Sequence, residues 1–177
     1  YFDQETMKID HIHNPQVRGD VSELVVEKPV VSGTPTYFFR REAFLANGGW
    51  KESEEIGIIS DWEMGARFCQ KWKVDYVPES LINVYVNHGV MRMSENRYYK
   101  QKLEKLIKFE KYFLQEFYNV FNKYPERAYK HYYDLSRALM LMGRYSEAWP
   151  YYKKLLFKRH TFKDIFLIPF CLTHKAE

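Results

Sequence analysis

Apolar positions follow different spacings in the two halves of this chain. Before residue 95 they form short runs that Pro and Gly interrupt, whereas beyond Ser94 they recur with the spacing of a helix. One face of a single long helix is predicted to carry Leu103, Leu106, Ile107, Phe113, Leu114, Phe117 and Phe121. We therefore expect a subdomain boundary near residue 95, between a mixed part over residues 1–95 and a mainly α-helical part over residues 96–177.

The helical part ends in a segment with the spacing of two paired helices. Its apolar and small residues match one helix-turn-helix unit of the tetratricopeptide type, at Leu135, Gly143, Tyr145, Ala148, Tyr152 and Leu155. Pro150 is compatible with this unit if the second helix is capped near Ser146. The first turn of a helix has unpaired backbone donors, so a proline there removes no hydrogen bond.

The first part of the chain carries two helix signals. Residues 40–47 predict a short helix that ends at Gly48 and Gly49, since glycine is the usual left-handed exit from a helix. Ser60 followed three residues later by Glu63 has the form of a capping box, and it predicts a helix over about residues 61–72.

The same part carries strand signals. Residues 1–27 are irregular and indicate a strand end followed by a loop. Short runs rich in Val, Ile and Tyr predict strands at residues 74–77 and 81–86, separated by Pro78-Glu79-Ser80. Strands mixed with short helices make this part α/β in character.

Composition narrows the class of protein only a little. Hydrophobic residues make up 46% and charged residues 28%, which is ordinary for a globular protein. Cys69 and Cys171 lie far apart and have no spacing typical of a metal site or a disulfide framework. No apolar run reaches the roughly 18 residues that a membrane span needs, so any membrane contact is expected to be peripheral.

The formal charge of +4 is modest, and the predicted long helix carries a group of lysines at Lys100, Lys102, Lys105, Lys108 and Lys111. Glu104, Glu110 and Glu116 lie among those lysines and no nucleic-acid-binding motif accompanies them, so we expect a solvated face and no nucleic acid. A second interpretation is that this basic and aromatic helix rests on an anionic membrane. The apolar segment 165–172 either docks there as well or closes the helical core.

A series of short motifs over residues 31–94 resembles the second half of family-two glycosyltransferases. In order along the chain they are Gly33, Arg40-Arg41, Gly48-Gly49-Trp50-Lys51-Glu52, Ser60-Asp61-Trp62-Glu63 with Arg67, Leu81 to Tyr85, His88 and Ser94. The chain departs from the family pattern at Lys51 and Ser60, which stand where the family has acidic residues.

This resemblance implies an α/β nucleotide-sugar-transferase fold of the GT-A type, of which this chain holds the acceptor-side half. The implied activity is inverting transfer of a sugar from a nucleotide-sugar donor to a polysaccharide or a lipid-linked acceptor. It further implies a divalent metal, Mn or Mg, whose main ligands in the family, an Asp-x-Asp pair, are absent from this chain. On this interpretation the chain is incomplete as an enzyme, and the whole protein is cytoplasmic, at the inner face of the cytoplasmic membrane.

The resemblance also assigns roles to individual residues. Asp61 is the implied catalytic base, and its place at a helix start suits this role because the helix dipole favours an ionised carboxylate. Acids in that position are also common simply as complements of the dipole. Implied acceptor contacts are Gly33, Gly49, Trp50, Trp62 and Glu63, and the implied late metal ligand is His88.

Each of these residues also has a structural alternative. Helix termination accounts for the two glycines, and a core position accounts for Trp62. Glu63 is explained as the capping-box partner of Ser60, and a lone His such as His88 is often structural. For the protein as a whole, the alternative is a helical interaction module of tetratricopeptide type on a scaffold without catalysis.

Overall fold

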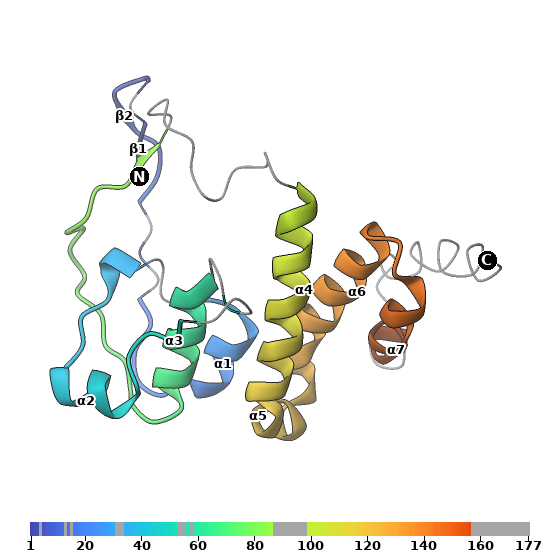
Figure 1. Ribbon diagram of the computed structural model, residues 1–177. Helices are drawn as coiled ribbons and strands as arrows, with labels where there is room; N and C mark the ends of the chain where they lie inside the picture. The colour runs from blue at the N-terminus through green and yellow to red at the C-terminus, as the bar shows by residue number, and fades with distance from the viewer. Residues whose placement is uncertain are drawn as a thin grey trace. The chain divides into compact units, whose positions relative to one another are not determined.

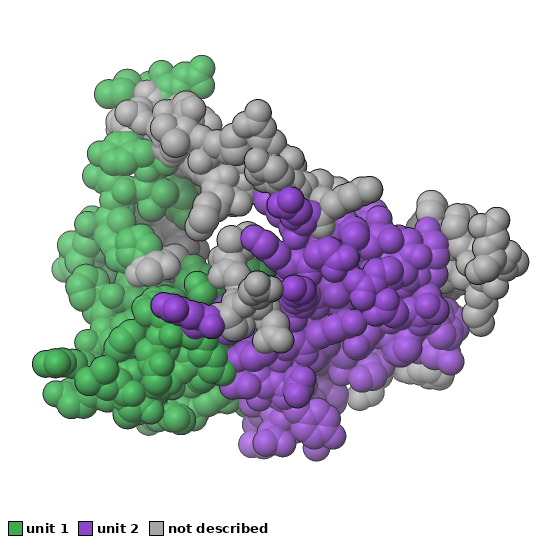
Figure 2. Space-filling model, viewed as in Figure 1, with its two compact units in different colours: residues 1–51, 58–96 green, residues 52–57, 97–177 purple. Residues whose placement is uncertain are grey.

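The computed structural model describes residues 1–3, 5–12, 14, 16–30, 34–52, 56, 59–86 and 99–156, and these are mainly helical. They belong to two compact units, one of residues 1–51 and 58–96 and the other of residues 52–57 and 97–177 (Figure 2). The described part of the second unit is almost entirely helical, which confirms that aspect of the predicted fold class. No described helix combines the length and the apolar character needed to cross a membrane.

The first unit contains a small sheet whose three strands have two residues each. Strand β1 (Phe2–Asp3) is central, β2 (Lys8–Ile9) pairs with it antiparallel and β3 (Tyr85–Val86) pairs with it parallel. The strand predicted at residues 81–86 is thus reduced to its last two residues. The strand predicted at 74–77 is wrong: Val74 alone forms a bridge, to Gly19. A strand exists only where a neighbour completes its hydrogen bonds.

Among its described residues, the first unit also contains three short helices (Figure 1). They are α1 (Ser22–Glu27), α2 (Arg41–Ala46) and α3 (Ser60–Cys69), and the 3-10 turn η1 lies at Thr34–Thr36. The helices at residues 41–46 and 60–69 confirm the two helix predictions, whereas α1 corrects the predicted loop. Helix α1 forms because Val25 and Val26 are buried on the side that packs against α3.

The second unit is built from α4 (Tyr99–Glu116), α5 (Tyr118–Lys123), η4 (Pro125–Ala128), α6 (Tyr129–Leu141) and α7 (Tyr145–Leu156). Figure 1 shows α6 lying beside α4 and pairing with α7. The single long helix predicted here is divided at Phe117, which has left the helical conformation. Its ring stays buried with those of Phe113 and Phe121, so the predicted apolar face continues across the break.

Helices α6 and α7 form the predicted helix-turn-helix unit. Gly143 lies in the turn with φ +73°, a conformation that glycine adopts without strain. Tyr152 and Ala148 of α7 are fully buried in the hydrophobic core that α7 shares with α4 and α6. The prediction that Pro150 falls in the first turn is wrong, because α7 begins at Tyr145 and Pro150 lies one turn further in. The proline therefore leaves the Ser146 carbonyl without its helical partner.

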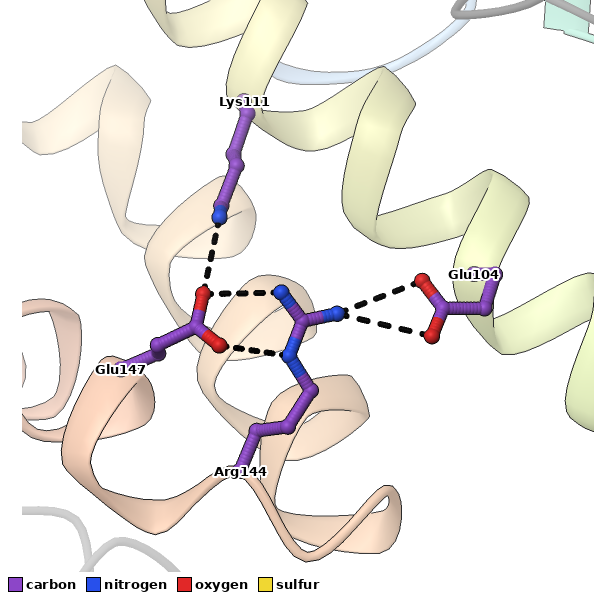
Figure 3. A network of polar contacts seen from close by, with 4 residues as sticks. All are labelled: Glu104, Lys111, Arg144 and Glu147. Atoms are coloured by element: carbon purple, nitrogen blue, oxygen red, sulfur yellow. Dashed lines mark hydrogen bonds and ion pairs between the residues drawn. The ribbon is translucent and has the colours of Figure 1, made fainter.

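Four charged side chains fasten the start of α7 to α4 (Figure 3). Arg144 binds Glu147 through two hydrogen bonds of 2.6 and 2.8 Å, and it reaches Glu104 of α4 at 3.2 Å. The ammonium group of Lys111 in α4 donates a hydrogen bond of 3.2 Å to a carboxylate oxygen of Glu147. These hydrogen bonds lower the pKa of Glu147 to about 2, the contribution of Arg144 being the largest.

A buried polar pair joins α4 to α6. The Nδ1 atom of His131 lies 2.6 Å from a carboxyl oxygen of Glu110, and both side chains are shielded from solvent. The rings of Phe113 and Phe121 pack against the imidazole, with centroids 4.9 and 5.2 Å away. Burial raises the pKa of Glu110 above its ordinary value, although the bond to His131 acts in the opposite direction.

Candidate functional site

The residue predicted to be catalytic lies in the first turn of α3. Asp61 is partly exposed, and one of its carboxylate oxygens accepts the backbone N–H of Trp62 at 2.8 Å. Bonds from N–H groups and the positive end of the helix dipole both stabilise a carboxylate in its ionised form. A half-exposed carboxylate held in this way is able to accept a proton from a bound hydroxyl group.

The capping box predicted for this helix is not formed. The N-cap residue is Ile59, helix α3 begins at Ser60, and Glu63 bonds with Arg67 instead. The Glu63 carboxylate is fully buried and takes two bonds from the guanidinium, at 2.9 and 3.3 Å. Lys51 approaches the same carboxylate at 3.4 Å. A buried charge requires charged partners of this kind, which the backbone N–H that a capping box offers to Glu63 does not supply.

Arg67 also holds the Gly-Gly turn onto α3. Its guanidinium donates to the backbone carbonyl of Asn47 and, at 2.7 Å, to that of Gly49. Gly48 and Gly49 both have positive φ, +79° and +61°, as expected for the exit from α2. These bonds join residues that are 20 and 18 positions apart in sequence, and they place the segment that leads to Trp50 beside α3.

An aromatic pair lies next to this turn. Trp50 is partly exposed, and its ring meets that of Tyr37 edge to face, with centroids 6.2 Å apart. The Tyr37 hydroxyl donates to the backbone carbonyl of Asp61 at 3.1 Å. The residues predicted at Gly49, Trp50, Asp61 and Glu63 therefore all gather around the first half of α3. Part-exposed aromatic rings of this kind can stack on the C–H face of a sugar.

Trp62, the remaining described residue of the predicted acceptor set, has a core position. Its side chain is only 7% exposed, and its indole N–H donates to the carbonyl of Val25 in α1 at 2.6 Å. This hydrogen bond satisfies the polar edge of the ring inside the core. The geometry corresponds to the structural alternative for this residue, in which Trp62 joins α3 to α1.

The remaining two predicted residues, Gly33 and His88, lie outside the described residues. Within the part of the chain that is described, no three His, Cys, Asp or Glu side chains are grouped closely enough to hold a metal ion.

Sequence reasoning missed the contribution of Tyr37 and the bonds that Arg67 makes to backbone carbonyls. Tyr37 lies in an apolar run with Phe38 and Phe39, where nothing local separates a site residue from a core residue. Arg67 was part of the recognised motif, but its reach to Asn47 and Gly49 depends on a tertiary contact. Only the folded chain brings such partners together.

Comparison with known proteins adds no identification. No family model matches the chain, no curated protein matches it, and no solved structure matches it.

Proposed function

We propose that the first unit is the acceptor-side part of an inverting glycosyltransferase of family two. The observation that carries this proposal is that Arg67 holds the Gly-Gly turn before Trp50 onto α3, while Tyr37 contacts the Trp50 ring and bonds to the backbone carbonyl of Asp61. A carboxylate and an aromatic face on one side of a helix start are the two elements that an acceptor sugar requires. Glu63, buried under Arg67, supports this arrangement and does not contact substrate.

In the proposed reaction Asp61 acts as the general base. It removes the proton of an acceptor hydroxyl as the oxygen attacks the anomeric carbon of the donor sugar, and the nucleoside diphosphate leaves from the opposite face. A divalent metal, when bound, stabilises the charge of the leaving diphosphate. We propose that its ligands and the donor-binding residues lie outside the described residues. The proposed roles of Asp61 and Trp50 do not depend on this metal.

The small sheet and helices α1 to α3 are, on this proposal, part of a larger α/β nucleotide-sugar-transferase fold of the GT-A type. Support comes from apolar side chains that the sheet leaves exposed, at 68% for Ile9 and 51% for Tyr85, because a two-residue strand gains little stability alone. The acceptor is a polysaccharide or a lipid-linked saccharide. We place the whole protein in the cytoplasm at the inner face of the membrane, with lysines of α4 facing anionic lipid.

The proposal is tested by sugar transfer in the protein that carries this chain together with its donor-binding part. Nucleotide sugars are titrated in the presence of manganese, and release of the nucleoside diphosphate is measured for the wild type, Asp61→Asn and Asp75→Asn. Asp75 is a matched control, since it is an exposed carboxylate of the same unit bonded to Arg18. Loss of turnover in Asp61→Asn alone supports the proposal. Equal turnover in all three proteins refutes it.

A second candidate function has an observation of its own in the second unit. Helices α6 and α7 form a hairpin that leaves Leu141 50% exposed at the end of α6, and the sequence of this hairpin resembles one tetratricopeptide unit. On this alternative the hairpin binds a partner protein and the first unit is a scaffold. Capture of a specific protein by the intact chain, saturable and lost in Leu141→Glu but kept in the control Leu45→Glu, would favour it. Equal capture by both variants would argue against it.

A further inference from the structure

Tyr37 contacts two parts of the candidate site at once. Its hydroxyl donates to the Asp61 carbonyl, its ring meets the Trp50 ring edge to face, and its other neighbour is the Phe39 ring, stacked at 5.3 Å. One side chain thus contacts both the backbone of the proposed base and the aromatic face beside it. Tyr37 therefore couples the position of the Asp61 backbone to the position of the Trp50 ring.

Gly65 supplies the space that Tyr37 occupies. A Cβ atom added to Gly65 would lie 2.8 Å from the Tyr37 hydroxyl oxygen, closer than real Cβ contacts allow. Gly65 lies in the middle of α3, where glycine is less favourable for a helix than alanine. Its backbone is not in the left-handed region, so conformation does not demand a glycine here. The close approach of the phenol accounts for it.

The Tyr37 hydroxyl is held in its protonated form. Burial is the main factor that raises its pKa, and the charges of Asp61 and Cys69 raise it further. A protonated hydroxyl can donate its hydrogen to the Asp61 carbonyl, as the 3.1 Å contact shows.

We propose that Tyr37, seated in the space left by Gly65, is a positioning residue that holds the Trp50 indole beside Asp61 as the stacking face for an acceptor sugar ring. This inference rests on the proposed transferase function. It identifies the acceptor as a saccharide whose ring presents a C–H face to Trp50 while its nucleophilic hydroxyl points to Asp61. Tyr37 acts through Trp50 and does not touch the reacting atoms.

The kinetic test compares Tyr37→Leu, Tyr37→Phe and Gly65→Ala with Tyr76→Leu in the transfer assay. Tyr76 is a matched control, since it is a tyrosine of the same unit whose ring contacts Arg18. Loss of an aromatic contact raises the acceptor KM in Tyr37→Leu and Gly65→Ala roughly tenfold, while kcat and the donor KM stay within about twofold. Tyr37→Phe, which keeps the ring, has a smaller effect. An unchanged acceptor KM in Tyr37→Leu, or a fall in kcat alone, overturns the inference.

A second measurement separates this inference from the proposed function. Indole N–H resonances are recorded by NMR on the 177-residue chain, with Trp50 assigned through Trp50→Phe and Trp149 of the other unit as internal control. The inference expects Tyr37→Leu to shift the Trp50 resonance and leave that of Trp149 in place, and an unshifted Trp50 resonance overturns it. If the wild type transfers no sugar while Trp50 still shifts, the proposed function fails and the contact geometry stands.

Discussion

Removing Arg67 is expected to destabilise the first unit severely. In Arg67→Met the fully buried carboxylate of Glu63 loses both of its guanidinium bonds and keeps Lys51 at 3.4 Å, while the carbonyls of Asn47 and Gly49 lose a donor. Breaking a buried ion pair from one side costs about 3–5 kcal/mol, because the remaining charge stays in the interior. Such a loss is a large share of the stability of a small unit.

The assay is urea unfolding followed by tryptophan fluorescence, since Trp50, Trp62 and Trp72 all report on the first unit. The matched control is the double variant Glu63→Leu with Arg67→Met, which removes both charges together. Replacing a whole buried pair with apolar groups is far less costly than breaking it, so the double variant should be more stable than Arg67→Met. A loss below about 1 kcal/mol in the single variant, or a double variant no better than it, would refute this reasoning.

Three further predictions concern charge and packing. Burial raises the pKa of Glu110 above 4.5, so its contribution to stability is full below pH 4.5 and falls as the pH rises toward the folded value. In thermal melts, the Tm of Glu110→Gln should fall less steeply with rising pH than the Tm of the wild type. An unchanged slope of Tm against pH would contradict this prediction. Glu147 has its pKa lowered to about 2, so its contribution is present above pH 4.5 and is lost as the pH falls toward 2. Acid titration followed by circular dichroism should show a weaker pH dependence of folding between pH 4.5 and about 2 for Glu147→Gln than for the wild type. Coinciding curves for the two proteins would contradict this prediction. Trp62→Phe leaves the Val25 carbonyl unpaired and should cost about 1–3 kcal/mol in urea unfolding, whereas a change within error would mean that the bond contributes little.

Strong local signals explain what could be predicted from the sequence. The short helix ending at Gly48 and Gly49 follows from glycine chemistry at a helix exit, and the hairpin at Gly143 follows from the same chemistry with helical spacing on both sides. The roles of Trp50 and Asp61 were implied by family resemblance, not by the residues alone. Local periodicity says which face of a helix is buried, and it says nothing about which distant loop lies on that face.

What could not be predicted depends on tertiary partners. Helix α1 exists because Val25 and Val26 pack against α3. Residues 74–77 do not form a strand, because only Val74 of these has a bridge partner among the described residues, Gly19. Glu63 had two available partners at helical spacing, Ser60 and Arg67, and burial selected the charged one. The pairing of Glu110 with His131 likewise joins two helices that no local pattern connects.

The most direct test of the central claim is the kcat of Asp61→Asn relative to the wild type, measured at saturating donor and acceptor. Removal of a general base lowers kcat by about two to four orders of magnitude, and the account predicts a loss of that size with little change in the donor KM. An Asp61→Asn protein that transfers sugar within about twofold of the wild-type rate would contradict the account, because no other residue is assigned to accept the proton.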